Sequence, residues 1–90
     1  MLGSIEFKNL SEKFIKDYVD EHLDKTDEEV KYKVYNVWYC KTLQNHKGLF
    51  STTLPDGMYY EVTFNGDKEE FYIDAYKKWE NQCIPFRKEK

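Results

Sequence analysis

Two histidines and two cysteines are the side chains of this chain best suited to nucleophilic or metal chemistry. Cys40 and Cys83 form no Cys-x-x-Cys motif and have no companion histidines at metal-ligand spacing. A nucleophilic pair of Cys40 and His22 would need an open cleft, for which a 90-residue chain has little room. We therefore interpret both cysteines as free, buried thiols that pack as small apolar residues. We interpret His22 as a half-buried helix residue and His46 as a solvated loop residue.

The acidic side chains make no stronger case for catalysis. Asp20, Asp24 and Asp27 have neither the spacing nor the glycine of a calcium loop. Glu69 and Glu70 would need a substrate pocket beside them to act as an acid and base pair. The nucleophile-elbow, P-loop, zinc-protease and dinucleotide motifs are all missing from the sequence. We therefore predict that the protein is not an enzyme and has no catalytic residues, metal or cofactor.

Charge and hydropathy narrow the classes of partner. The chain has 14 basic and 17 acidic residues, a net charge of −3, whereas dedicated duplex-DNA binders usually carry a basic surplus. Its apolar runs are far shorter than the roughly 20 residues that span a bilayer. The N-terminus lacks a basic stretch followed by an apolar one, so no export signal is evident. We therefore expect a cytoplasmic protein that does not contact membranes.

A helix is predicted over about residues 10–24. Asn9 and Glu12 have the spacing of a helix-capping box, and apolar residues then recur every three or four positions. The opposite side of this helix is acidic, a pattern that is usually only a solvated surface but that could also meet a basic partner. The acidic residues that we consider as a binding surface are Asp17, Asp20, Glu21 and Asp24.

After the helix the apolar period changes to two, which indicates strands. We place the strands at about residues 32–43, 48–54, 58–64 and 69–73, and a short helix at about residues 75–83. The predicted fold is a single α+β domain over residues 1–90. It is a four-stranded antiparallel β-meander packed on one face by the N-terminal helix, with a short C-terminal helix.

Two turns determine the parity of the later strands, that is, which alternate residues of each strand face inward. The Pro55–Gly57 segment suits a three-residue hairpin loop with Gly57 at positive φ, and Asn65-Gly66 predicts a loop of two or four residues. The inner face is then predicted to comprise Phe50, Thr52, Leu54, Met58, Tyr60, Val62, Phe64, Phe71 and Ile73.

The first hairpin leaves two alternatives. A loop at His46–Gly48 would turn Val34, Trp38 and Cys40 inward, whereas a change of one residue would turn Tyr35, Val37 and Tyr39 inward instead.

The outward side of the predicted sheet is rich in tyrosine. With a loop at His46–Gly48, Tyr35, Tyr39, Tyr59 and Tyr72 share this side. They could be ordinary cross-strand pairs, or a contact surface for another protein or a second copy of the chain. Stacking on nucleobases is a further alternative, but it usually comes with a basic groove, and the lysines here are scattered. We therefore take these four tyrosines as candidate protein-binding residues.

Four segments of the chain form a distinctive pattern, namely Val34–Asn45, Leu54–Val62, Asn65–Lys68 and Asp74–Lys78. This pattern resembles small uncharacterised proteins of tailed phages and prophages of Gram-positive bacteria. The resemblance implies a phage accessory protein in the cytoplasm of the bacterial host, and it carries over no site residues. We expect a non-enzymatic interaction module that binds and modulates a host protein, in host takeover or anti-defence. A homodimer is a further expectation, and a nucleic-acid or nucleotide binder is the less favoured alternative.

Overall fold

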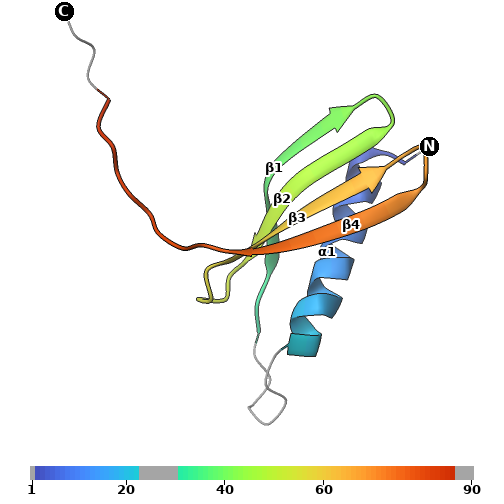
Figure 1. Ribbon diagram of the computed structural model, residues 1–90. Helices are drawn as coiled ribbons and strands as arrows, with labels where there is room; N and C mark the ends of the chain where they lie inside the picture. The colour runs from blue at the N-terminus through green and yellow to red at the C-terminus, as the bar shows by residue number, and fades with distance from the viewer. Residues whose placement is uncertain (1, 23–30, 87–90) are drawn as a thin grey trace, which may run out of the picture.

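The computed structural model describes residues 2–22 and 31–86. One helix, α1 (Ser4–His22), precedes four strands, which are β1 (Val34–Thr42), β2 (Asn45–Thr52), β3 (Met58–Asn65) and β4 (Glu70–Lys77). The strands pair in the order β1-β2-β3-β4, each pair is antiparallel, and α1 lies across one face of the sheet (Figure 1). The predicted α+β fold with a four-stranded meander is confirmed.

Helix α1 begins at Ser4, well before the start near residue 10 that the capping pattern predicts. The reason is that Phe7, which is fully buried, extends the apolar stripe by one turn toward the N-terminus. Asn9 is therefore an exposed residue inside the helix and not its cap. His22 is exposed rather than half-buried, and its Nδ1 lies 2.7 Å from the carbonyl oxygen of Tyr18. The predicted helix end, residue 24, lies outside the described residues.

The core lies between α1 and the inner face of the sheet. Phe7, Ile15 and Val19 of α1 are buried, and the half-buried Phe14 packs edge-on against Phe71 at 5.1 Å between ring centroids. The predicted inner-face residues of β2, β3 and β4 all lie in this core or pack against it. The buried ones are Phe50, Thr52, Tyr60, Val62 and Phe64, and the partly buried ones are Leu54, Met58, Phe71 and Ile73.

The loop between β2 and β3 is longer than predicted, but the parity is as predicted. A three-residue loop at Pro55–Gly57 predicts that Phe50 pairs with Val62, whereas Phe50 pairs with Tyr60, so the register differs from the predicted one by two residues. An even shift keeps every side chain on its face, which is why the inner-face prediction holds. Gly57 has φ of +68°, as predicted, and its carbonyl oxygen accepts a 2.8 Å hydrogen bond from the backbone N–H of Lys78.

The first hairpin differs from both alternatives because β1 contains a bulge. The turn lies at Leu43 and Gln44, and the register shifts between Asn36 and Trp38, which leaves Val37 unpaired. An extra residue in one strand reverses the alternation beyond it. Val34 packs against the core and so does Tyr39, whereas Trp38 and Cys40 are exposed. Each alternative is thus correct for one half of the strand.

The predicted C-terminal helix at residues 75–83 is wrong. Strand β4 continues to Lys77, where Ala75, Tyr76 and Lys77 pair with Tyr60, Tyr59 and Met58 of β3. A helix of nine residues is too short to be stable alone, so the free pairing positions on β3 favour the strand. The segment after β4, residues 78–86, has no regular secondary structure and runs away from the sheet and helix (Figure 1). We call residues 78–86 the arm.

Candidate interaction surface

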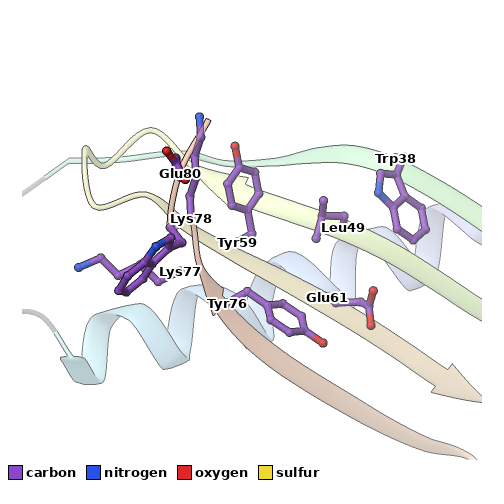
Figure 2. A pocket seen from close by; sticks show the side chains of 9 residues that line it. Trp38, Leu49, Tyr59, Glu61, Tyr76, Lys77, Lys78 and Glu80 are labelled. Carbon is purple, nitrogen blue, oxygen red and sulfur yellow. The ribbon is translucent and has the colours of Figure 1, made fainter. Parts of the chain in front are cut away.

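The sheet face turned away from α1 is the most distinctive surface of the molecule. We call it the outer face. Its large side chains come from all four strands, and Figure 2 shows several of them on the side of the sheet opposite the helix. The outer face is defined by Tyr35 and Trp38 from β1, Leu49 from β2, Tyr59 from β3, and Tyr72 and Tyr76 from β4.

Strand register places these side chains in rows across the outer face. Tyr59 pairs directly with Tyr76, and Trp38 pairs with Leu49. Paired residues in a sheet have Cβ atoms about 4.5–5.5 Å apart, so each pair forms a continuous apolar surface. Much of that surface meets solvent, because the exposed fractions of Trp38 and Tyr76 are 42% and 51%. Tyr35 and Tyr72, at 47% and 44%, extend the exposed aromatic surface.

A hollow of about 500 Å³ opens on the outer face (Figure 2). Its floor comes from the sheet and one wall comes from the end of β4 and the start of the arm. Trp79 lines the rim but leaves the hollow unfilled, since 96% of its side chain is exposed. The lining residues are Trp38, Leu49, Tyr59, Glu61, Tyr76, Lys77, Lys78, Trp79 and Glu80.

Carboxylates stand among the aromatic residues of the outer face. Glu61 and Asp74 are direct cross-strand partners, so two like charges lie side by side. Lys47 forms an ion pair with Glu61, with 3.4 Å between Nζ and Oε1. Within the described residues, neither Glu61 nor Asp74 has another ion pair. The outer face is therefore aromatic with an acidic centre, and it is not a basic groove.

Tyr39 does not belong to the outer face, contrary to the sequence-based prediction. It lies beyond the bulge in β1 and turns toward α1, where its ring centroid is 5.6 Å from that of Phe7. Its hydroxyl lies 2.5 Å from Nδ1 of His46, and burial raises the pKa of Tyr39 above its ordinary value. Trp38 takes the outward position that the prediction gave to Tyr39.

His46 is a core residue and not a solvated loop residue. Its exposed fraction is 1%, and its ring stacks on Phe7 with centroids 5.2 Å apart. Nε2 lies 2.9 Å from the carbonyl oxygen of Leu2, which can only accept, so Nε2–H donates. The Tyr39 hydroxyl lies within hydrogen-bond distance of Nδ1, the second ring nitrogen. Both ring nitrogens therefore have hydrogen-bond partners within the fold.

The cysteines are free, as expected, but both are exposed rather than buried. The bulge turns Cys40 outward, and Cys83 lies in the arm instead of a helix. His22 stacks on Tyr18 of α1 with centroids 4.2 Å apart, on the opposite side of the sheet from Cys40. In residues 2–22 and 31–86, no three His, Cys, Asp or Glu side chains gather as a group that could hold a metal.

The acidic residues of α1 form a second, separate surface. Asp17, Asp20 and Glu21 are exposed, whereas Asp24 lies outside the described residues. The carboxylate of Asp20 accepts a 2.5 Å hydrogen bond from the hydroxyl of Tyr32. Burial, together with this bond to Asp20, raises the pKa of Tyr32 far above its ordinary value. Because α1 covers the inner face, these carboxylates and the outer face point to opposite sides of the molecule.

Sequence reasoning missed three aromatic residues of the candidate surface. The sequence predicts Tyr76 and Trp79 on a short helix, and it turns Trp38 inward in one of the two alternatives for the first hairpin. The signal for Tyr76 was available, because it follows Tyr72 at an even spacing, as expected of two residues on one face of a strand. The signal for Trp38 was not available, because a bulge of one residue does not change the composition of a strand.

A family comparison covers nearly the whole fold. The model of DUF6275, a family of unknown function, matches residues 8–86, which include most of α1, the sheet and the arm. The chain belongs to DUF6275. No curated protein and no solved structure matches it. No helix in the described part of this DUF6275 member combines the length and the apolar content needed to cross a membrane.

Proposed function

We propose that this protein is a non-enzymatic interaction module whose outer face binds another protein. The observation that carries the proposal is the group of large aromatic side chains that stay between 42% and 51% exposed on one sheet face. A sheet face that only meets water usually presents polar residues, whereas contiguous exposed apolar patches usually mark interaction sites. The members of this group are Tyr35, Trp38, Tyr72 and Tyr76.

The chemistry of these residues suits protein recognition. Tyrosine and tryptophan bury large areas at low entropic cost, and they are the residue types enriched among interface hot spots. The hollow beside Trp38 and Tyr76 offers a concave site for an apolar anchor from a partner. Glu61 and Asp74 would favour a partner that brings a basic residue next to that anchor.

The proposed partner is a protein of a bacterial host. The resemblance to small phage and prophage proteins supports this choice, and with it a role in the host cytoplasm in host takeover or anti-defence. The exposed carboxylates of Asp17, Asp20 and Glu21 are a second candidate contact, for a basic partner surface. Binding of nucleic acid is less favoured, because carboxylates at the centre of the outer face would repel phosphates.

The test is capture from nuclease-treated bacterial lysate by the parent protein and by Trp38→Thr/Tyr76→Thr, which we call the face variant. Threonine keeps the preference for strands and removes the aromatic surface. The face variant should melt close to the parent and capture little. Ile5→Thr, which changes an exposed apolar residue on α1, is the control and should capture normally.

Two outcomes would contradict the proposal. One is normal capture by the face variant. The other is that Asp17→Lys/Glu21→Lys loses capture while the face variant keeps it, which would show that the binding surface lies on α1. If the parent instead retains nucleic acid from untreated lysate and releases it steeply with salt, the nucleic-acid alternative is correct.

A further inference from the structure

The arm presents apolar side chains that nothing in the described chain covers. Trp79, Ile84 and Phe86 are 96%, 81% and 88% exposed. Single exposed apolar residues are ordinary, whereas three large ones within eight residues form a concentrated apolar stretch of the kind that marks interaction sites. The same molecule therefore carries an uncovered apolar arm and an uncovered aromatic outer face.

We propose that two copies of this protein form a dimer by exchanging arms, with the arm of each copy lying on the outer face of the other. In this arrangement Trp79 of one copy enters the hollow between Trp38 and Tyr76 of the second copy. The inference rests on the proposed function in one respect, which is that the outer face is a binding surface.

The geometry at the root of the arm favours exchange over folding back. The backbone N–H of Lys78 donates to the carbonyl oxygen of Gly57 at 2.8 Å, so the arm leaves the body at a fixed point. Trp79 follows directly at the hollow, and its side chain is almost fully exposed to solvent. The segment from Lys78 to Phe86 has no regular secondary structure, and it runs away from the body instead of lying on its own sheet (Figure 1).

The area matches what a stable dimer needs. Two aromatic side chains and one isoleucine, nearly fully exposed, present roughly 400–500 Å² per arm. Two arms and the two faces that receive them would then bury about 1,600–2,000 Å² in total, which is the standard size of a specific interface. In the proposed dimer the same two copies exchange arms reciprocally, so the assembly closes with two-fold symmetry and does not extend into a fibre.

One charge on the arm can pair with the outer face. Glu61 and Asp74 stand side by side on the outer face, and Trp79 lies between Lys78 and Glu80 on the arm. An arm that places Trp79 in the hollow of the second copy therefore brings one charge of each sign, and Lys78 is the one that can pair with the two carboxylates.

The experiment measures self-association of the full chain by sedimentation velocity over a concentration series. The parent should dimerise, and Trp79→Ser/Phe86→Ser, which we call the arm variant, should associate at least about tenfold more weakly. Asn81→Ala/Gln82→Ala changes polar arm residues and is the matched control, which should dimerise normally. The face variant should also be monomeric.

Mixing the arm variant with the face variant distinguishes arm exchange from other modes of dimerisation. The arm variant keeps an intact face and the face variant keeps an intact arm, so a mixture should form a heterodimer with one complete contact. A parent that stays monomeric overturns the proposal, and so does an arm variant that still dimerises, because its faces would then pair directly. The arm variant should still capture a host partner, so loss of dimerisation with normal capture leaves the proposed function intact.

Discussion

The side-chain amide of Asn36 donates a 2.8 Å hydrogen bond to the carbonyl oxygen of Trp38, across the unpaired Val37. The same amide donates to the carbonyl oxygen of Leu49 at 3.0 Å on the neighbouring strand. These two bonds hold the bulge in β1. The bulge in turn places Trp38 outward and Tyr39 inward, so Asn36 lies at the point where β1 changes which side chains reach the outer face.

Replacing Asn36 by alanine should destabilise the protein. The change leaves the carbonyl oxygens of Trp38 and Leu49 without these donors, and an unsatisfied partner costs about 1–3 kcal/mol. Urea unfolding measures the loss of free energy. Asn9→Ala is the control, because Asn9 is exposed on α1, and it should change stability by less than about 0.5 kcal/mol. Equal effects of the two substitutions would show that Asn36 does not hold the bulge.

Two serines with opposite surroundings give a second prediction. Ser11 Oγ is buried without a hydrogen-bond partner among the described residues, whereas Ser51 Oγ donates to the carbonyl oxygen of Met58 at 2.8 Å. Ser11→Ala should be neutral or stabilising by up to about 1 kcal/mol, and Ser51→Ala should be destabilising by a similar amount. Thermal melting of both variants checks the signs. A destabilised Ser11→Ala would mean that the hydroxyl has a partner.

Two isoleucines of α1 test the core. Ile15 is fully buried and Ile5 is 74% exposed. Ile15→Ala should cost about 2–5 kcal/mol, because it removes buried methylene groups and leaves a cavity. Ile5→Ala should cost less than about 0.5 kcal/mol. Denaturant unfolding distinguishes them, and equal costs would contradict the placement of α1 on the sheet.

Alkaline stability should depend on Tyr60. Burial is the main cause that raises its pKa above the ordinary value of 10.0, so the folded state keeps its proton at a pH where the unfolded chain loses it. Its contribution is therefore complete below the unfolded pKa and is lost as pH rises through the folded one. Tyr60→Phe should reduce the fall in stability between about pH 8 and about pH 11. An unchanged fall would show that Tyr60 does not contribute.

The sequence predicts the parts of the fold that follow from strict alternation. The inner face from Phe50 to Ile73 is correct although the β2–β3 register shifts by two residues, because an even shift preserves parity. The prediction of a positive φ at Gly57 is correct because the turn requires it. The prediction that Phe64 and Phe71 share the inner face across the β3–β4 loop is also correct, since the two residues pair directly.

The sequence could not predict features that depend on tertiary contacts. The bulge at Val37 is accompanied by a hydrogen bond from Asn36 to the neighbouring strand, and no local pattern encodes that contact. The helix predicted near Tyr76 has a real apolar spacing, but pairing with β3 prevails. As a result, the sequence predicted an aromatic outward surface, with Tyr35, Tyr59 and Tyr72 on it, but not the roles of Trp38 and Trp79.

The chain has two tryptophans, Trp38 and Trp79, and both are at the proposed contact, which permits one direct measurement. The protein labelled with 5-fluorotryptophan gives one fluorine signal for each, and the sensitivity of each signal to D₂O reports contact with water. We predict that the Trp38 signal shifts and loses this sensitivity when an unlabelled host partner or a second copy binds. Association that leaves the Trp38 signal and its solvent sensitivity unchanged would contradict the claim that the outer face is the binding surface.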